Sequence, residues 1–296
     1  MVVAAVALLT QFVAIPAAGA DVSFGALAAR WAPIHYQDTD STDYDADYLS
    51  PIDYDGGWNT LNNWEHQDDD VSDLVGTVYH SVTRTSTHWF IIYAYYHPRD
   101  WDDNPFASEH ENDLEGVLLT IRRDGSTYGR FEAMVTVAHE DFYSFTPPGS
   151  SYGDGREDVD GPAIMQPYGN WLRPTTRQEA KGHGVKAWDG NNFPGGDGIV
   201  YYPLAGGRVP SGGNDRNVGY QLVDIFAPAG CGRTATTPRR SSTGASSAAT
   251  TVTTTPPTPR GDGTTTTTVA TCCMACSPLT RPSWCPSTSA AKARSP

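Results

Sequence analysis

Apolar and polar residues alternate with a period of two in several short segments of this chain, and helix-like patterns are scarce apart from residues 24–31. A period of two is typical of a strand with one buried face. The segments are rich in aromatic residues and are separated by Gly, Pro, Asp and Asn. We predict strands at 77–84, 88–96, 114–122, 130–139, 199–203 and 220–226. The pattern predicts an all-β fold, an antiparallel β-sandwich of the jelly-roll kind with long loops.

One of these strands carries two carboxylates on its core-facing side. With a period of two, Asp113 and Glu115 share a face with Val117, Leu119 and Ile121. Carboxylates seldom occupy such a stripe without a partner, because an unpaired buried charge is costly. A cation is the simplest partner, and nearby residues could complete its shell: Asp100, Asp102, Asp103, Glu109, His110 and Glu111.

The next strand adds a histidine to this set. Residues 122–125 indicate a turn, and a hairpin with Ile121 opposite Phe131 would place Asp113 opposite His139. The same register puts Ala133, Val135 and Val137 on the face of His139, and a slip of one residue would reverse it. The alternative is an acidic rim on a β-sandwich, with His139 as a hydrogen-bonded core residue.

The two segments 93–100 and 109–115 resemble the central motif of the necrosis- and ethylene-inducing-like proteins. In that family a Tyr-x-x-Tyr-x-Pro-Lys-Asp pattern leads through a loop to Gly-His-Arg-His-Asp-Trp-Glu. The resemblance implies a divalent cation held by Asp100, His110, Asp113 and Glu115. The chain departs from the motif at Asn112 and Leu114 and in a loop about two residues longer, so the resemblance does not carry toxin activity with it.

A second resemblance is to the vacuolar protein sorting 62-like family, which has a His-Glu-x-Asp-Trp-Glu version of the motif. It extends to residues 31–36 and to the Gly-His-Gly triplet at His183. We expect His139, His183 and Asp102 to support the cation ligands or to contact a bound molecule. The acidic loop 38–47 fails the spacing of an EF-hand, and we expect it to be solvated.

The two ends of the chain differ from its middle. Residues 1–20 are apolar and end in Ala-Gly-Ala, which predicts a signal peptide and a secreted protein. Of the 34 acidic residues only Asp262 lies beyond position 228, whereas 7 of the 20 basic residues do. Residues 229–296 also hold all five cysteines and are rich in Thr, Ser, Ala and Pro. Such a segment is predicted to be disordered, either as a stalk or, as the abrupt loss of acids favours, as a shifted reading frame.

Residues 21–228 are thus the predicted domain, and their charge limits what they bind. Residues 1–228 contain 33 acidic and 13 basic residues. Because basic residues drive binding to phosphates, this excess of acids excludes a nucleic acid as the main ligand. An oxygen-rich shell suits Ca²⁺, Mg²⁺ or Mn²⁺. Three functions fit: a secreted, cation-dependent module that binds a glycan or lipid head group without being an enzyme; a metal-dependent hydrolase; or a structural domain with a loop-ordering metal. No transmembrane segment is predicted, and the oligomeric state stays open.

Overall fold

A computed structural model of the chain describes residues 22–227, apart from 56–59, 105, 107–108, 151–158, 192, 194–195 and 204–205. The predicted signal peptide at 1–20 and the predicted tail at 229–296 lie outside the described residues.

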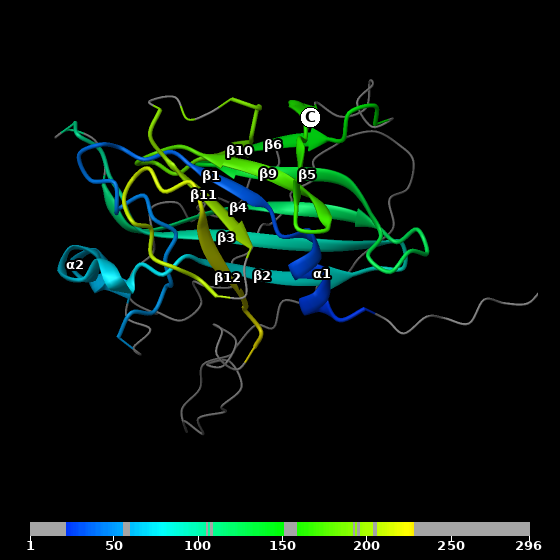
Figure 1. Cartoon of the computed structure of the whole chain (residues 1–296), viewed down its shortest axis with the longest axis horizontal. Helices are drawn as coiled ribbons and strands as arrows, with labels where there is room; N and C mark the ends of the chain where they lie inside the picture. The colour runs from blue at the N-terminus through cyan, green and yellow to red at the C-terminus, as the bar shows by residue number, and fades with distance from the viewer. Residues whose placement is uncertain are drawn as a thin grey trace, which may run out of the picture.

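The described part of the chain is mostly β, with short helices (Figure 1). No helix in it is long and apolar enough to span a membrane. The helices are α1 (Phe24–Trp31), η1 (Thr60–Asn62), α2 (Asn63–Asp69) and η2 (Val71–Asp73). The strands are β1 (Ile34–Gln37), β2 (Thr77–Arg84), β3 (His88–Asp100), β4 (His110–Arg122), β5 (Arg130–Ala138), β6 (Asp141–Thr146), β7 (Gly161–Pro162), β8 (Met165–Tyr168), β9 (Trp171–Gln178), β10 (Val185–Ala187), β11 (Ile199–Pro203) and β12 (Val218–Asp224).

The described strands form one sheet in the order β10-β9-β1-β11-β12-β2-β3-β4-β5-β6-β7, with β8 paired to β9. Four neighbouring pairs are parallel: β1 with β9, β11 with β12, β12 with β2, and β6 with β7. The β class is therefore confirmed, but the sheet is mixed where an antiparallel jelly-roll sandwich was expected. Two of the parallel pairs arise because β12, the last strand of the described residues, inserts between β11 and β2.

The sheet curls so that its ends face each other. In Figure 1, β1, β9 and β10 lie across the face of β3, β4 and β5. β10 packs against β4 and β5, and the Tyr95 hydroxyl on β3 lies 3.1 Å from Oγ1 of Thr176 on β9. Buried aromatic and aliphatic residues fill the space between the two halves, among them Tyr93, Val117, Leu119 and Tyr201. This curl brings the end of β9 against the carboxylates of β4.

Helix α1 closes one end of this core. Ser23 caps it by accepting a hydrogen bond from the amide of Ala26, and Leu27 and Trp31 are buried against the sheet. Its last carbonyls are bound by side chains from the strands. The Tyr93 hydroxyl donates to the carbonyl of Ala28, and Arg173 on β9 donates to three others.

The hairpin of β4 and β5 has the expected turn but a different register. Ile121 pairs with Phe131 as predicted, whereas Thr120 pairs with Ala133, because Glu132 is an extra residue in a β-bulge. The bulge reverses the faces of β5 beyond it, so Thr136 is buried and Val135 is partly exposed. The predicted stripe of Ala133, Val135 and Val137 on the core face is therefore wrong. His139 consequently does not lie opposite Asp113, and its amide instead donates to Glu115.

The side chain of the bulge residue Glu132 lies on the outer face of the sheet, where it contacts His88 and Arg122. Its Oε2 lies 2.7 Å from Nε2 of His88, and its Oε1 accepts from Nε of Arg122. Burial by itself raises its pKa, but the hydrogen bonds from Arg122 and His88 outweigh it and hold the pKa of Glu132 below its ordinary value.

A Glu132→Gln variant should lower the free energy of unfolding at pH 7 by about 1–3 kcal/mol. Because the folded-state pKa is depressed, this contribution is present above pH 4.5, the ordinary value, and disappears as the pH falls further. Urea unfolding at neutral and acidic pH measures it, with Glu140→Gln in the exposed turn after β5 as the control. If the difference in the free energy of unfolding between wild type and variant stays constant down to pH 3, Glu132 does not stabilise the protein as an ionised carboxylate.

Candidate functional site

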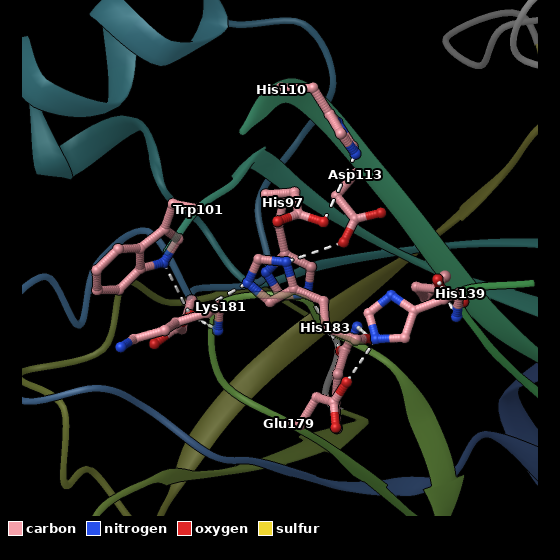
Figure 2. Close-up of polar contacts among 12 residues, drawn as sticks. His97, Trp101, His110, Asp113, His139, Glu179, Lys181 and His183 are labelled. Atoms are coloured by element: carbon pink, nitrogen blue, oxygen red, sulfur yellow. Dashed lines mark hydrogen bonds and ion pairs between the residues drawn. The ribbon is translucent and has the colours of Figure 1, made fainter. Parts of the chain in front are cut away.

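The candidate site lies where the end of β3 and the start of β4 meet the turn after β9 (Figure 2). The loop after β1 closes it from the side, and its Asp47 is fully buried. Polar side chains from these four segments converge beneath the surface of the molecule.

Asp113 and Glu115 on β4 are both buried on the face of Val117, as the alternation predicted. Oε1 of Glu115 accepts a 2.9 Å hydrogen bond from the amide of His139. Oε2 is also buried, and it has no hydrogen-bond partner within the described residues. Burial, together with the negative charge of Asp113, raises the pKa of Glu115 to about 9. This carboxylate is therefore short of a positively charged partner.

His183 lies between two carboxylates and has no exposed surface. Its Nδ1 is 3.0 Å from Oδ2 of Asp113, and its Nε2 is 3.1 Å from Oδ1 of Asp47. Burial lowers the pKa of an imidazole, but the hydrogen bonds to Asp113 and Asp47 outweigh it and raise the pKa of His183 to about 9. Carboxylates only accept hydrogen bonds, so both ring nitrogens donate and His183 is an imidazolium.

The turn that carries His183 has an unusual backbone. Lys181 and His183 adopt left-handed conformations, with φ of 70° and 54°. A non-glycine residue in this region costs about 1–3 kcal/mol, and such residues cluster at functional sites. The glycines beside His183 are closely packed: a Cβ at Gly182 would lie 2.8 Å from Cε1 of His139, and one at Gly184 would lie 2.9 Å from Cβ of Ala138. The Gly-His-Gly sequence thus allows the turn to press against β5.

Asp100 and His110 lie directly opposite each other on β3 and β4, with Oδ2 and Nε2 3.5 Å apart. Strict alternation would put His110 on the opposite face from Asp113. Asn112 interrupts the alternation with a φ of 64°, and Figure 2 shows His110 and Asp113 on the same side. Burial and the nearby charge of Asp113 raise the pKa of Asp100. Asp100 and Asp113 are thus close enough to repel each other.

Of the seven residues that the sequence singled out, six converge: Asp100, His110, Asp113, Glu115, His139 and His183. Asp102 does not join them, because it is exposed and accepts a hydrogen bond from the amide of Asn104. His139 is half exposed, and its Nε2 is 2.7 Å from Oε1 of Glu179.

Sequence reasoning missed Asp47, which accepts from the Trp101 indole and the Lys181 amide as well as from His183. The loop around it was expected to be solvated, and for Asp47 this is wrong. The sequence did hold a signal, because Asp47 sits in an apolar run with Ala46, Tyr48 and Leu49.

The donor set suits a hard divalent cation, since three carboxylates and one imidazole meet here and one buried carboxylate oxygen lacks a partner. In the described residues, no group of three or more His, Cys, Asp or Glu side chains is placed close enough to hold a metal ion as it stands. At Asp113, one carboxylate oxygen is not free to bind a metal ion, because it accepts a hydrogen bond from the ring of His183. A cation would need these side chains to rotate toward it.

The family model described as necrosis inducing protein (NPP1) matches residues 48–190. Among solved structures, necrosis and ethylene inducing protein 2 from the causal agent of witches' broom disease of cocoa is 16% identical, with a TM-score of 0.36, over 58% of this chain and 73% of that one. The non-toxic protein HaNLP3 is 15% identical, with a TM-score of 0.34, over 60% of this chain and 74% of that one. NLPPya in complex with glucosamine is 18% identical, with a TM-score of 0.29, over 57% of this chain and 68% of that one.

A comparison with curated proteins gives no match. None of the matches found supports the resemblance to the vacuolar protein sorting 62-like family. The matched region contains every residue of the predicted cation motif, from Asp100 to Glu115. The family model thus confirms the resemblance of residues 48–190 to the necrosis-inducing-like proteins.

Proposed function

We propose that this chain is a secreted protein that binds a divalent cation through Asp100, His110, Asp113 and Glu115 and, beside it, a glycan or lipid head group. The observation that carries the proposal is the buried Oε2 of Glu115, which has no partner among the described residues. An ionised carboxylate in such a place is costly unless a cation neutralises it. The match to the necrosis-inducing-like family over the same residues supports the assignment.

The donor types favour Ca²⁺, Mg²⁺ or Mn²⁺, because these ions prefer carboxylate oxygens. When bound, the cation would neutralise carboxylates that repel one another and offer an open coordination position to a polar ligand. Asp100 and His110 end the two strands that flank the loop 101–109. A cation bound to both residues would therefore join the end of β3 to the start of β4.

A polar ligand would meet Lys181, whose side chain lies over the buried ring of Trp101. Nζ of Lys181 lies 5.0 Å from the centre of the Trp101 ring and pairs with Asp40 and Asp103. Two solved NLPPya structures are complexes with glucosamine and with mannosamine, and these amino sugars are the first probes to use. Secretion is proposed from the family match and from the predicted signal peptide.

Millimolar Ca²⁺, Mg²⁺ or Mn²⁺ should raise the melting temperature of the wild-type protein, because a cation that binds only the folded state stabilises it. An Asp113→Asn variant should lose most of this gain, since it removes a central ligand. Asp102→Asn is the matched control: it makes the same change in charge at an exposed position nearby and should respond as the wild type does. Equal shifts in wild type and Asp113→Asn would place the ion elsewhere and overturn the assignment.

The same three proteins test the second part of the proposal. Glucosamine and mannosamine should perturb NMR signals around Trp101 in the cation-loaded wild type and the Asp102→Asn variant. The perturbation should disappear with EDTA and in Asp113→Asn. Sugar binding that survives EDTA would mean that the cation does not organise the ligand site.

A further inference from the structure

Gln178, the last residue of β9, joins three buried groups behind the candidate cation site. Its Oε1 lies 3.0 Å from Nε2 of His35 and 3.1 Å from Nε2 of His97. Its Nε2 donates to the backbone carbonyl of His183 at 2.6 Å. All four residues are fully buried. The amide therefore makes three hydrogen bonds away from water, where leaving a polar group unpaired costs about 1–3 kcal/mol.

The protons of this network have one consistent arrangement. The His183 carbonyl only accepts, so the amide nitrogen of Gln178 faces it and Oε1 faces the two imidazoles. That oxygen also only accepts, so His35 and His97 both donate from Nε2. Burial lowers the pKa of His35 to about 3 and that of His97 well below its ordinary value, which keeps both rings neutral.

This arrangement leaves Nδ1 of each neutral ring without a proton, so that it can only accept a hydrogen bond. Nδ1 of His35 accepts from the hydroxyl of Thr176, 2.9 Å away. The backbone of Tyr48 also interacts with the His97 ring. Gln178 supplies the side-chain hydrogen bond that orients this ring.

Gln178 restrains His183 in two ways. It binds the His183 carbonyl directly, and it orients His97, whose ring stacks on that of His183 at 3.7 Å and an angle of 3°. The edges of the His183 ring are taken by Asp113 and Asp47. A residue held in a left-handed conformation persists only where its surroundings restrain it. The amide of Gln178 is a direct restraint on its backbone, because it binds the carbonyl of His183.

We infer that Gln178 is a positioning residue of the cation site: it fixes the backbone and ring of His183, and His183 in turn fixes the carboxylate of Asp113. Gln178 itself touches no predicted ligand of the cation. The inference rests on the proposed function, since Asp113 must bind the cation for its position to matter. Hydrogen-bonded supports of metal ligands typically contribute 10–100-fold to metal affinity.

The test is a Gln178→Met variant, which keeps the length of the side chain but removes all three hydrogen bonds. Gln221→Met is the matched control, because Gln221 also lies on a strand of the sheet and donates to a threonine hydroxyl, that of Thr77. Calorimetric titration with Ca²⁺, Mg²⁺ and Mn²⁺ should show at least a tenfold loss of affinity in Gln178→Met. Gln221→Met should bind as the wild type does.

Proton NMR of the cation-free proteins supplies a reading that general destabilisation would not change. The two ring N–H protons of His183 should give low-field signals in the wild type and in Gln221→Met, and these should shift or broaden in Gln178→Met. If the methionine variant does not fold, Gln178→Asn, which is one methylene shorter, replaces it with the same measurements. Equal cation affinity in wild type and the Gln178 variant overturns the positioning role alone. A wild type that binds none of the three cations overturns the proposed function and this inference with it.

Discussion

Replacing Arg173 by methionine is expected to lower the free energy of unfolding by roughly 3–5 kcal/mol, because one buried and two partly buried backbone carbonyls lose their donor together. Nη1 of Arg173 lies 2.8 Å from the carbonyl oxygen of Ala29, 3.3 Å from that of Arg30 and 3.0 Å from that of Ala32. These carbonyls belong to the last turn of α1 and the residue that follows it, where no further helical amide can reach them. A cation at this end also interacts favourably with the helix dipole.

Methionine fills much of the same space but donates no hydrogen bond. The melting temperature should therefore fall by on the order of 10 °C. Arg177→Met, four residues further along β9 at a partly exposed position, is the matched control and should cost no more than about 1 kcal/mol. Chemical denaturation of the three proteins measures the difference. If both variants lose the same amount, water must satisfy the carbonyls of α1, and Arg173 would not be its cap.

The sequence predicted those parts of the fold that depend on local pattern. The strand at 77–84, the strand at 199–203 and the helix at 24–31 are confirmed residue by residue, because a regular period and clear loop residues mark each of them. Six strands were missed: β1, β6, β7, β8, β9 and β10. The positions of the shortest four, β1, β7, β8 and β10, depend on pairing with distant strands, and pairing leaves little trace in a segment of two to four residues.

The register of β5 shows where alternation fails. One extra residue, Glu132, reverses every later side chain, and nothing in the Phe-Glu-Ala sequence marks the bulge. Asn112 is a similar case, although asparagine tolerates the left-handed region better than most residues and could have suggested it.

The candidate site was predictable as far as its residues lie near one another along the chain. The motif from Asp100 to Glu115 occupies one hairpin, and a two-residue period aligned its carboxylates. Gln178 and Asp47 come from segments far away in sequence, so only the curled sheet brings them there. His183 was predictable in part. Its flanking glycines indicated a tight turn, but they did not indicate which residues His183 contacts.

The second large effect concerns Glu115. Adding the cation is expected to reverse the order of stability of the wild type and a Glu115→Gln variant. Without a cation, a Glu115→Gln variant should melt several degrees higher than the wild type. The glutamine keeps an oxygen for the amide of His139. It also removes the cost of holding a buried carboxyl protonated beside Asp113 at neutral pH, which follows from its raised pKa. With a cation at about 100 times its Kd, the wild type should gain about 2.7 kcal/mol. That gain corresponds to roughly 5–10 °C for a domain of this size.

The variant should gain little from the cation, so the order of the two melting temperatures should cross as the cation is added. Glu140→Gln makes the same change in charge in the exposed turn after β5, and it should follow the wild type in both conditions. Thermal melts of the three proteins in EDTA and in millimolar Ca²⁺, Mg²⁺ or Mn²⁺ decide the matter. A Glu115→Gln variant that is less stable than the wild type in EDTA would mean that the carboxylate already has a partner within the protein. The cation would then have no unpaired charge to neutralise, and Glu115 could not be the residue on which the site depends.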